Sequence, residues 1–217
     1  MPRLAPRAVL LRCCLWAGLL LAGPAAQALA PDESVRLQAT GSVEVAFSPW
    51  NDPEEAILAA FEEARELILV QAYLFTSKPL LQGLLDAKAR GVKVEVLLDA
   101  DMNRPGSYTV LPELLEAGIP VALETRYTNA HNKVVILDPH SPSRAALITG
   151  SYNFTRAAKT SNAENLLILR GNPALVRVYL ENWKRHKDEA QILRKQDAEA
   201  WRRGKANGRK SDRTASD

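Results

Sequence analysis

The sequence predicts an α/β fold in which a mixed β-sheet carries helices on both faces. Between residues 43 and 186, short apolar runs of strand length alternate with amphipathic stretches of helix length, a pattern typical of a sheet covered by helices. Hydrophobic residues make up 47% of the 217-residue chain and charged residues 24%, as in globular proteins. These observations exclude a disordered, collagen-like or multi-span membrane chain.

Seven segments are predicted as strands because each is a short, mostly aliphatic and β-branched run. They cover residues 43–47, 67–73, 92–98, 120–123, 133–137, 145–149 and 165–169. Because helical segments separate most of them, some neighbouring strands are expected to be parallel and others antiparallel.

Four helices are predicted, over residues 51–64, 79–90, 111–117 and 173–186. Residues 51–55 supply a capping side chain, a proline for the first turn and two acids that favour the positive end of the helix dipole. Gly91 and Gly118 end the second and third helices. The closing helix gathers large apolar side chains on one face, namely Leu175, Val176, Tyr179, Leu180 and Trp183.

Residues 1–28 have the features of a secretory signal peptide. Three arginines precede an apolar run over residues 13–22, and small residues follow up to Ala28, after which we expect cleavage. The apolar run is about half of the ~20 residues that span a bilayer. Cys13 and Cys14 both lie in this segment, so the mature protein would contain no cysteine and no disulfide. We therefore expect a periplasmic or secreted protein.

The basic residues are concentrated at the two ends of the chain. The formal net charge is +3, yet residues 29–190 carry more acids than bases, so the basic character is no evidence for a nucleic-acid-binding core. After Gln196 the apolar pattern is lost. Residues 197–217 are therefore predicted to be a basic, disordered tail.

The first chemistry-bearing segment is Ala130–Asp138. Residues two apart in a strand share a face, so His131 and Lys133 are predicted to project together. A histidine beside an ammonium group can attack a phosphodiester while the lysine neutralises the phosphoryl oxygens. Asp138 lies seven residues from His131, an odd separation that places it on the other face or beyond the strand end.

Two further segments add polar groups. Gly150 follows a strand, and Ser151 and Asn153 offer donors from alternate positions of the loop after it. Glu164 precedes another strand, and its carboxylate is available to accept the Nδ1–H of a histidine. Taken singly, each piece is also compatible with an ordinary turn or a solvated loop.

Taken together, these residues resemble the signature of the phospholipase D superfamily. The matching residues are His131-x-Lys133-x4-Asp138, Gly150-Ser151-x-Asn153-Phe154 and Glu164-Asn165. The likeness covers residues 40–190, predicted to be a phospholipase D-like catalytic domain, and extends to small secreted bacterial nucleases with one motif per chain. It implies a phospholipase D-like fold and a phosphohistidine intermediate that needs no metal or other cofactor.

The resemblance also implies residue roles. His131 would attack phosphorus, Lys133 and Asn153 would bind the phosphoryl oxygens, and Ser151 would assist or position. Glu164 would orient the histidine, and Asp138 would be structural.

This reaction uses two histidines, but the chain has one motif and no internal repeat. His140 and His186 lack a lysine at the matching offset and are predicted to be exposed and inert. The resemblance therefore implies a homodimer whose active site spans the two-fold axis, with His131 and Lys133 contributed twice.

Two other hydrolytic chemistries fit the sequence less well. A catalytic metal would need a ligand set, whereas the histidines are scattered and Asp99-Ala100-Asp101 is the only tight acidic pair. Ser151 lacks the Gly-x-Ser-x-Gly turn of serine hydrolases.

The substrate is predicted to be nucleic acid, DNA or RNA, with a phosphatidylcholine-type phospholipid as the alternative. A nuclease would use a basic groove, for which the candidates are Arg104, Arg126, Arg144, Arg156 and Lys159. A phospholipase D would instead need an apolar entrance for acyl chains. A third hypothesis, a non-catalytic nucleic-acid-binding module that uses the basic tail, is disfavoured by the intact set of His131, Lys133 and Asn153.

Overall fold

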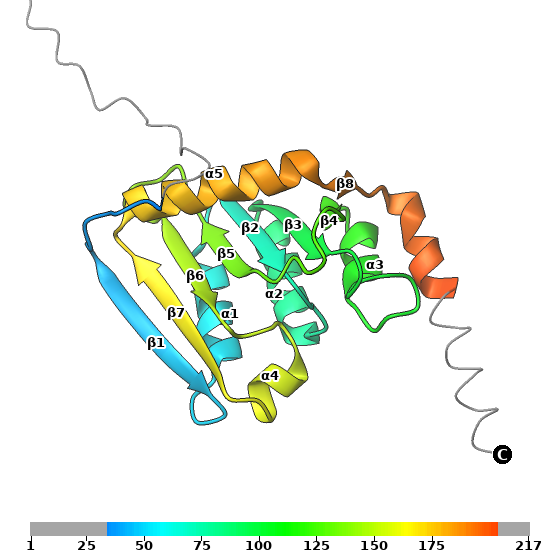
Figure 1. The fold of residues 1–217 in the computed structure, drawn as a ribbon, viewed down its shortest axis with the longest axis horizontal. Helices are drawn as coiled ribbons and strands as arrows, with labels where there is room; N and C mark the ends of the chain where they lie inside the picture. The colour runs from blue at the N-terminus through cyan, green and yellow to red at the C-terminus, as the bar shows by residue number, and fades with distance from the viewer. Residues whose placement is uncertain (1–33, 204–217) are drawn as a thin grey trace, which may run out of the picture. The chain divides into compact units, whose positions relative to one another are not determined.

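An eight-stranded mixed sheet organises the chain in the computed structural model, which describes residues 34–203 (Figure 1). The strands are β1 (Ser42–Ser48), β2 (Leu67–Ala72), β3 (Lys93–Asp99), β4 (Val121–Glu124), β5 (Lys133–Leu137), β6 (Ala146–Gly150), β7 (Glu164–Arg170) and β8 (Gln191–Ile192). Their order across the sheet is β1-β7-β6-β5-β2-β3-β4-β8. Strands β2, β3 and β4 run parallel, and the other neighbours are antiparallel. The predicted α/β class is confirmed, and all seven predicted strands are present.

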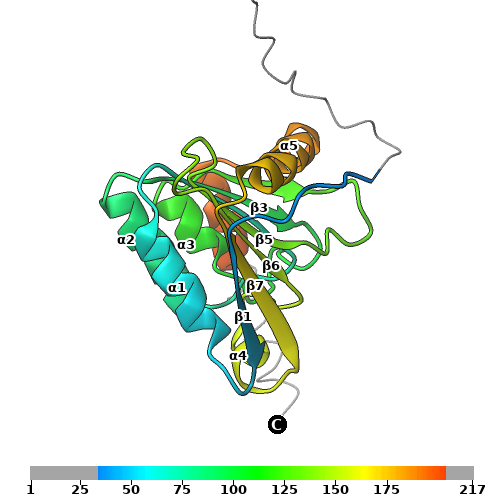
Figure 2. The same ribbon diagram turned by 90° about the vertical axis from the view of Figure 1, so that its left-hand side faces the viewer.

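Five α-helices flank the sheet: α1 (Pro53–Glu63), α2 (Lys78–Ala89), α3 (Leu111–Glu116), α4 (Arg156–Thr160) and α5 (Pro173–Glu189). Helices α1, α2 and α3 cover one face and α5 crosses the other (Figure 2). The Asp52 carboxylate caps α1 by accepting from the Glu55 N–H at 3.1 Å, as residues 51–55 predicted. The five-residue α4, capped by Thr155, escaped prediction because it is too short to show a helical period.

The core has two parts, one on each face of the sheet. Ile57, Leu80 and Leu114 belong to the cluster beneath α1, α2 and α3. Leu180 and Trp183 of α5 belong to the second cluster, and the Trp183 indole N–H donates to the Val70 carbonyl at 3.2 Å. The face of α5 predicted from the sequence is therefore the one that packs on the sheet.

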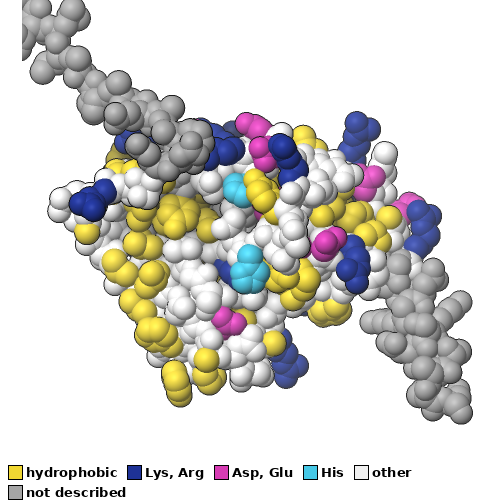
Figure 3. Space-filling view, in the orientation of Figure 1, with side chains coloured by type: hydrophobic (Ala, Val, Ile, Leu, Met, Phe, Trp, Pro, Cys, Tyr) yellow, Lys and Arg dark blue, Asp and Glu magenta, His cyan; other side chains and the backbone are white. Residues whose placement is uncertain are grey.

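Helix α5 covers one face of the sheet but leaves the edge strand β1 uncovered on that face. Val43 is paired with Leu169, which packs beneath α5, so Val43, Val45 and Phe47 all face the α5 side. These three side chains are about half exposed, and Trp50, in the turn after β1, is 82% exposed. We call these four residues the β1 stripe. Figure 3 shows a column of hydrophobic side chains along this side of the molecule.

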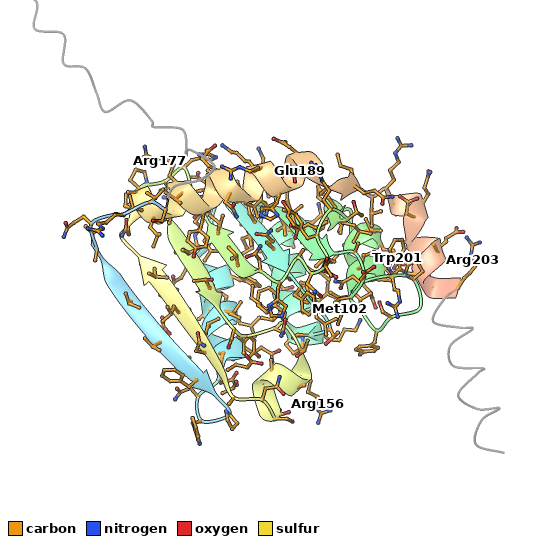
Figure 4. The ribbon with its side chains drawn as sticks, in the orientation of Figure 1. Met102, Arg156, Arg177, Glu189, Trp201 and Arg203 are labelled. Carbon is orange, nitrogen blue, oxygen red and sulfur yellow. The ribbon has the colours of Figure 1, made fainter. Side chains whose placement is uncertain are left out.

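The start of the predicted disordered tail was placed too early. Residues 198–203 are helical, and the Trp201 side chain is buried with its indole N–H 2.5 Å from the Asn103 carbonyl (Figure 4). The boundary was predicted from the loss of the apolar pattern after Gln196. A single tryptophan that packs on the domain produces no such pattern. Residues 204–217 and the predicted signal peptide lie outside the described residues. Within residues 34–203, no helix combines the length and hydrophobicity that a membrane span requires.

Trp201 gives a test of this boundary. Truncation after Gln196 should lower the free energy of unfolding by about 3–5 kcal/mol, the cost typical of removing a buried tryptophan. Truncation after Arg203 is the matched control and should leave the thermal unfolding midpoint unchanged. Equal midpoints for the two truncated proteins would show that the 198–203 helix contributes nothing to the fold.

Candidate active site

The predicted site residues meet at one edge of the sheet because three antiparallel strands begin or end there. Lys133 is the first residue of β5, Gly150 the last of β6 and Glu164 the first of β7. The carboxyl ends of the parallel strands β2 and β3 reach the same edge, since Ala72 pairs with Lys133 and β3 runs beside β2. Residues more than 30 positions apart in the sequence are thereby gathered in one place.

His131 and Lys133 lie together against Tyr73, the residue that follows β2. The His131 imidazole is exposed at the surface, and its ring centroid is 4.4 Å from that of Tyr73 in an edge-to-face contact. The Lys133 side chain is buried, and its Nζ donates to the His131 carbonyl at 2.7 Å. The ammonium also lies 4.8 Å from the Tyr73 ring centroid. A cation and an imidazole are thus held side by side.

Burial lowers the pKa of Lys133 to about 8, although the carboxylates of Glu164 and Asp99 act in the opposite direction. A lysine in this environment is charged at neutral pH and loses its proton under mildly alkaline conditions. Its ability to bind an anionic phosphoryl group should therefore end well below the ordinary lysine pKa.

This property predicts an alkaline limit to activity. The kcat/KM of the wild-type protein should fall above about pH 8, because the phosphoryl-binding role expected of Lys133 requires its charged form. In Lys133→Arg the cation persists to much higher pH, so the limit should disappear even if the rate is lower. The folded-state pKa lies below the unfolded one, so deprotonation of this group stabilises the fold as the pH rises. A thermal midpoint that falls in step with activity would therefore contradict this assignment.

Ser151 and Glu164 are hydrogen-bonded to each other at the same edge of the sheet. The Ser151 hydroxyl donates to Glu164 Oε2 at 2.6 Å and accepts from the backbone N–H of Asn165 at 3.0 Å. The other oxygen of Glu164 accepts from Asn162 Nδ2 at 2.9 Å. Among residues 34–203, none of the hydrogen bonds of Glu164 reaches the His131 of the same chain. The orientation of a histidine by Glu164, as expected from the sequence, is therefore not seen within one chain.

Gly150 allows β6 and β7 to lie close together beside Ser151 and Glu164. A Cβ atom at Gly150 would lie 2.3 Å from the Asn165 carbonyl oxygen, so a larger residue would push β6 and β7 apart. In the loop that follows, Asn153 Oδ1 is buried without a hydrogen-bond partner among the described residues. The loop is anchored at Phe154, whose carbonyl accepts from the N–H groups of Thr76 and Ser77, both at 2.9 Å.

Asp138 lies at the other end of β5, away from Lys133. Its buried carboxylate accepts from three consecutive backbone N–H groups, those of Arg65, Glu66 and Leu67, at 2.7–2.9 Å. Arg144 also donates to it at 3.3 Å. Burial raises the pKa of Asp138, but these hydrogen bonds outweigh burial and hold the pKa below its ordinary value. Asp138 thus fastens the α1–β2 corner to the end of β5.

Three residues that shape the site were not predicted as site residues from the sequence. Besides Tyr73, these are Asp99, which accepts from the Ala130 N–H at 2.7 Å, and Asn103, whose Nδ2 donates to the Tyr73 carbonyl at 3.0 Å. All three follow or end parallel strands of the sheet, a place where ligand sites are common in α/β folds. That topological signal was present, but the sequence does not state which strands are parallel.

The expected basic groove is largely absent. Arg126 pairs with Glu189 and Lys159 with Asp52 and Glu54. Arg144, next to Asp138, is at the far end of β5 from Lys133. Arg104 and Arg156 are exposed, and neither belongs to an ion pair found within residues 34–203. Arg156 projects from α4 (Figure 4), and Figure 3 shows only scattered basic side chains around the central histidine.

The other two histidines have different environments. His140 is exposed, as predicted. His186, expected to be exposed, is instead mostly buried and 2.5 Å from Glu124 Oε1, because α5 carries it onto the end of β4.

The arrangement suits phosphoryl transfer to a nitrogen nucleophile. His131 offers an exposed imidazole, Lys133 a protonated amine and Asn153 an amide, all at the same edge of the sheet. In the part of the chain that the structure describes, no cluster of three or more His, Cys, Asp or Glu side chains has the geometry of a metal site.

Comparison with known families agrees with this geometry. The protein-family model described as "Cardiolipin synthase, PLD-like domain" matches residues 57–187. This range includes every predicted site residue. A phospholipase D from Rickettsia typhi is 38% identical over 142 residues, which cover 65% of this chain and 66% of the relative. The match thus spans just under two thirds of the relative's length. The mouse mitochondrial cardiolipin hydrolase is 35% identical over 130 residues, covering 59% of this chain and 55% of the relative.

The fold comparison gives the same result. The crystal structure of Nuc, a phospholipase D family member from Salmonella typhimurium, superposes with a TM-score of 0.66 at 31% sequence identity. The match covers 71% of this chain and 99% of that one. The phospholipase D-like fold implied by the sequence is therefore confirmed.

Proposed function

The chain belongs to the phospholipase D superfamily, in the family of PLD-like domains named for cardiolipin synthase. We propose that it is a phosphodiesterase that hydrolyses phospholipids through a phosphohistidine on His131. The observation that carries the proposal is the meeting of His131, Lys133 and Asn153 at one edge of the sheet, with the ammonium 2.7 Å from the His131 carbonyl.

The reaction has two steps. His131 Nε2 attacks phosphorus, the bond from phosphorus to the leaving alcohol breaks, and the partner subunit's His131 gives its proton to the leaving oxygen. That second histidine then takes a proton from water, whose oxygen attacks phosphorus and breaks the phosphorus–nitrogen bond. Lys133 and Asn153 stabilise the charge on the non-bridging oxygens in both steps. Ser151 positions Glu164.

Phospholipid is preferred to nucleic acid for two reasons. The relatives with 35–38% identity are named for lipid substrates, phospholipase D and cardiolipin hydrolase. This reverses the preference predicted from the sequence, which was nucleic acid. In addition, residues 34–203 present no continuous row of free cations for a nucleic-acid backbone, since Arg126 and Lys159 are paired with carboxylates. Nucleic acid is the second candidate, because Arg104 and Arg156 are exposed and lie in the segments that follow β3 and β6, two strands that end at the edge of the sheet where the site lies.

A substrate panel tests the proposal. The protein should release headgroup and phosphatidic acid from phosphatidylcholine or cardiolipin vesicles in excess EDTA, because histidine and lysine carry the chemistry. Plasmid DNA and RNA are incubated in parallel, with His131→Asn as the control for contaminating enzymes. Activity that disappears with EDTA and returns with a divalent ion would refute the mechanism. If nucleic acid is cleaved and the lipids are not, the proposed substrate is wrong and the proposed mechanism stands.

We also propose that two copies share the site. Glu164 does not reach the His131 of its own chain, and the β1 stripe leaves apolar side chains uncovered on the sheet face that α5 only partly covers. A stable interface covers about 800 Å² of surface on each partner. The four residues of the β1 stripe are too few to provide that area, so the interface would extend toward His131. Export by the predicted signal peptide would place this dimer in the periplasm or outside the cell.

A further inference from the structure

Tyr73 touches both groups that would act on phosphorus. Its ring meets the His131 imidazole edge-to-face, with centroids 4.4 Å apart and planes at 62°. The same ring lies 4.8 Å from Lys133 Nζ. The exposed His131 imidazole would otherwise be free to sample several rotamers, whereas Lys133 is also held by burial and by its hydrogen bond to the His131 carbonyl.

Tyr73 is itself held from several sides. Its N–H donates to the Asn132 carbonyl at 3.0 Å and its hydroxyl to Asn129 Oδ1 at 3.1 Å. Its carbonyl accepts from Asn103 Nδ2, and Asn103 is fully buried and fixed by the Thr109 hydroxyl at 2.8 Å and the Trp201 indole at 2.5 Å. The ring is therefore a fixed surface attached to the sheet.

We propose that Tyr73 is a positioning residue that holds the His131 imidazole and the Lys133 ammonium in one reactive arrangement. The inference rests on the proposed function, which assigns the chemistry to these two residues. An edge-to-face contact fixes the plane of the imidazole, and the face of a tyrosine ring attracts an ammonium group. Holding reacting groups in place lowers the entropic part of the barrier, so the benefit should fall on kcat.

The ring also favours the charged form of Lys133. The ionisable groups that face this amine are Glu164 on β7 and Asp99 on β3, which favour the ammonium, and the neighbouring His131. Tyr73 adds its attraction to theirs. Removal of the ring should therefore let Lys133 lose its proton at lower pH and move the alkaline limit of activity downward.

The test compares three variants on a small diester, bis(p-nitrophenyl) phosphate, which avoids the choice between lipid and nucleic acid. Tyr73→Leu should lower kcat about tenfold with little change in KM, and the alkaline midpoint should fall by about half a pH unit, as expected from loss of a cation–π contact. Tyr73→Phe keeps the ring and should restore both values. Tyr127→Leu is the matched control, because Tyr127 stacks on His186 rather than His131, and it should resemble the wild type.

Two outcomes separate this inference from the proposed function. A wild-type kcat and pH profile for Tyr73→Leu, with His131→Asn inactive, overturns the role of Tyr73 alone. An active His131→Asn overturns the mechanism and this role with it. If Tyr73→Leu does not fold, NMR of the wild-type protein decides. The ring protons of His131, assigned by their absence in His131→Asn, should be displaced by the ring current of Tyr73, and unshifted resonances would overturn the contact.

Discussion

Replacement of His131 by asparagine should abolish hydrolysis while leaving the fold intact. The imidazole is exposed at the end of a strand and outside both core clusters, so its removal creates no cavity. It takes away the nucleophile and, in the proposed dimer, the proton donor as well. The expected result is activity at the background level, with a thermal midpoint and circular dichroism spectrum equal to those of the wild type.

Mixed dimers sharpen this prediction. When wild-type and His131→Asn subunits exchange, a heterodimer has one histidine and lacks either the nucleophile or the proton donor. Activity should then follow the square of the wild-type fraction, falling to about a quarter in an equal mixture under random pairing. Independent monomeric sites would retain about half. The outcome therefore distinguishes a shared site from a complete one in each chain.

Phe47→Asp provides a second approach to the same dimer. A charge in the middle of the β1 stripe should separate the subunits and abolish activity without lowering the stability of the single chain, since Phe47 is about half exposed. Glu44→Asp is the matched control, because Glu44 is on the same strand but faces away from the stripe. A Phe47→Asp protein that sediments as a monomer and retains full activity would refute the shared site.

Asp138→Ala should have a large effect on stability. It would leave three backbone N–H groups at the α1–β2 corner without their acceptor and place alanine at a backbone φ of +42°. Together these changes should lower the free energy of unfolding by about 4 kcal/mol. Asp138→Asn keeps one acceptor oxygen and tolerates this backbone geometry, so it should lose less.

The folded fraction of Asp138→Ala should nevertheless keep its activity. Lys133 and Asp138 are at opposite ends of β5, roughly 16 Å apart at the rise of a strand. Chemical denaturation gives the stability, and active-site titration gives the rate per folded molecule. Normal stability with a lost rate would mean that Asp138 acts in the chemistry after all.

The strands and helices could be predicted because their signals are local. Apolar runs, capping residues such as Asp52 and glycines such as Gly91 act within a few residues of their own positions. The order of the strands is different, because the pairing of β1 with β7 joins residues more than 110 positions apart. No local pattern carries that information.

The same distinction applies to the site. His131, Lys133 and Glu164 were found because they belong to a recognisable pattern. Tyr73 and Asn103 were missed because their place beside His131 depends on β2 and β3 lying next to β5. Trp201 was missed for a related reason, since its partner Asn103 is 98 residues away.

The long-range pairing of β1 affects how the chain can be made. β1 is the first strand to be synthesised, yet its neighbour in the sheet, β7, begins only at Glu164. Until then the strand has no partner, and its edge and the β1 stripe remain open to other chains. Pairings between distant residues also form slowly, because the intervening loop must first be closed. A nascent chain stopped before β7 would thus expose an unpaired strand edge at the N-terminal end of the domain, where association with other chains is favoured.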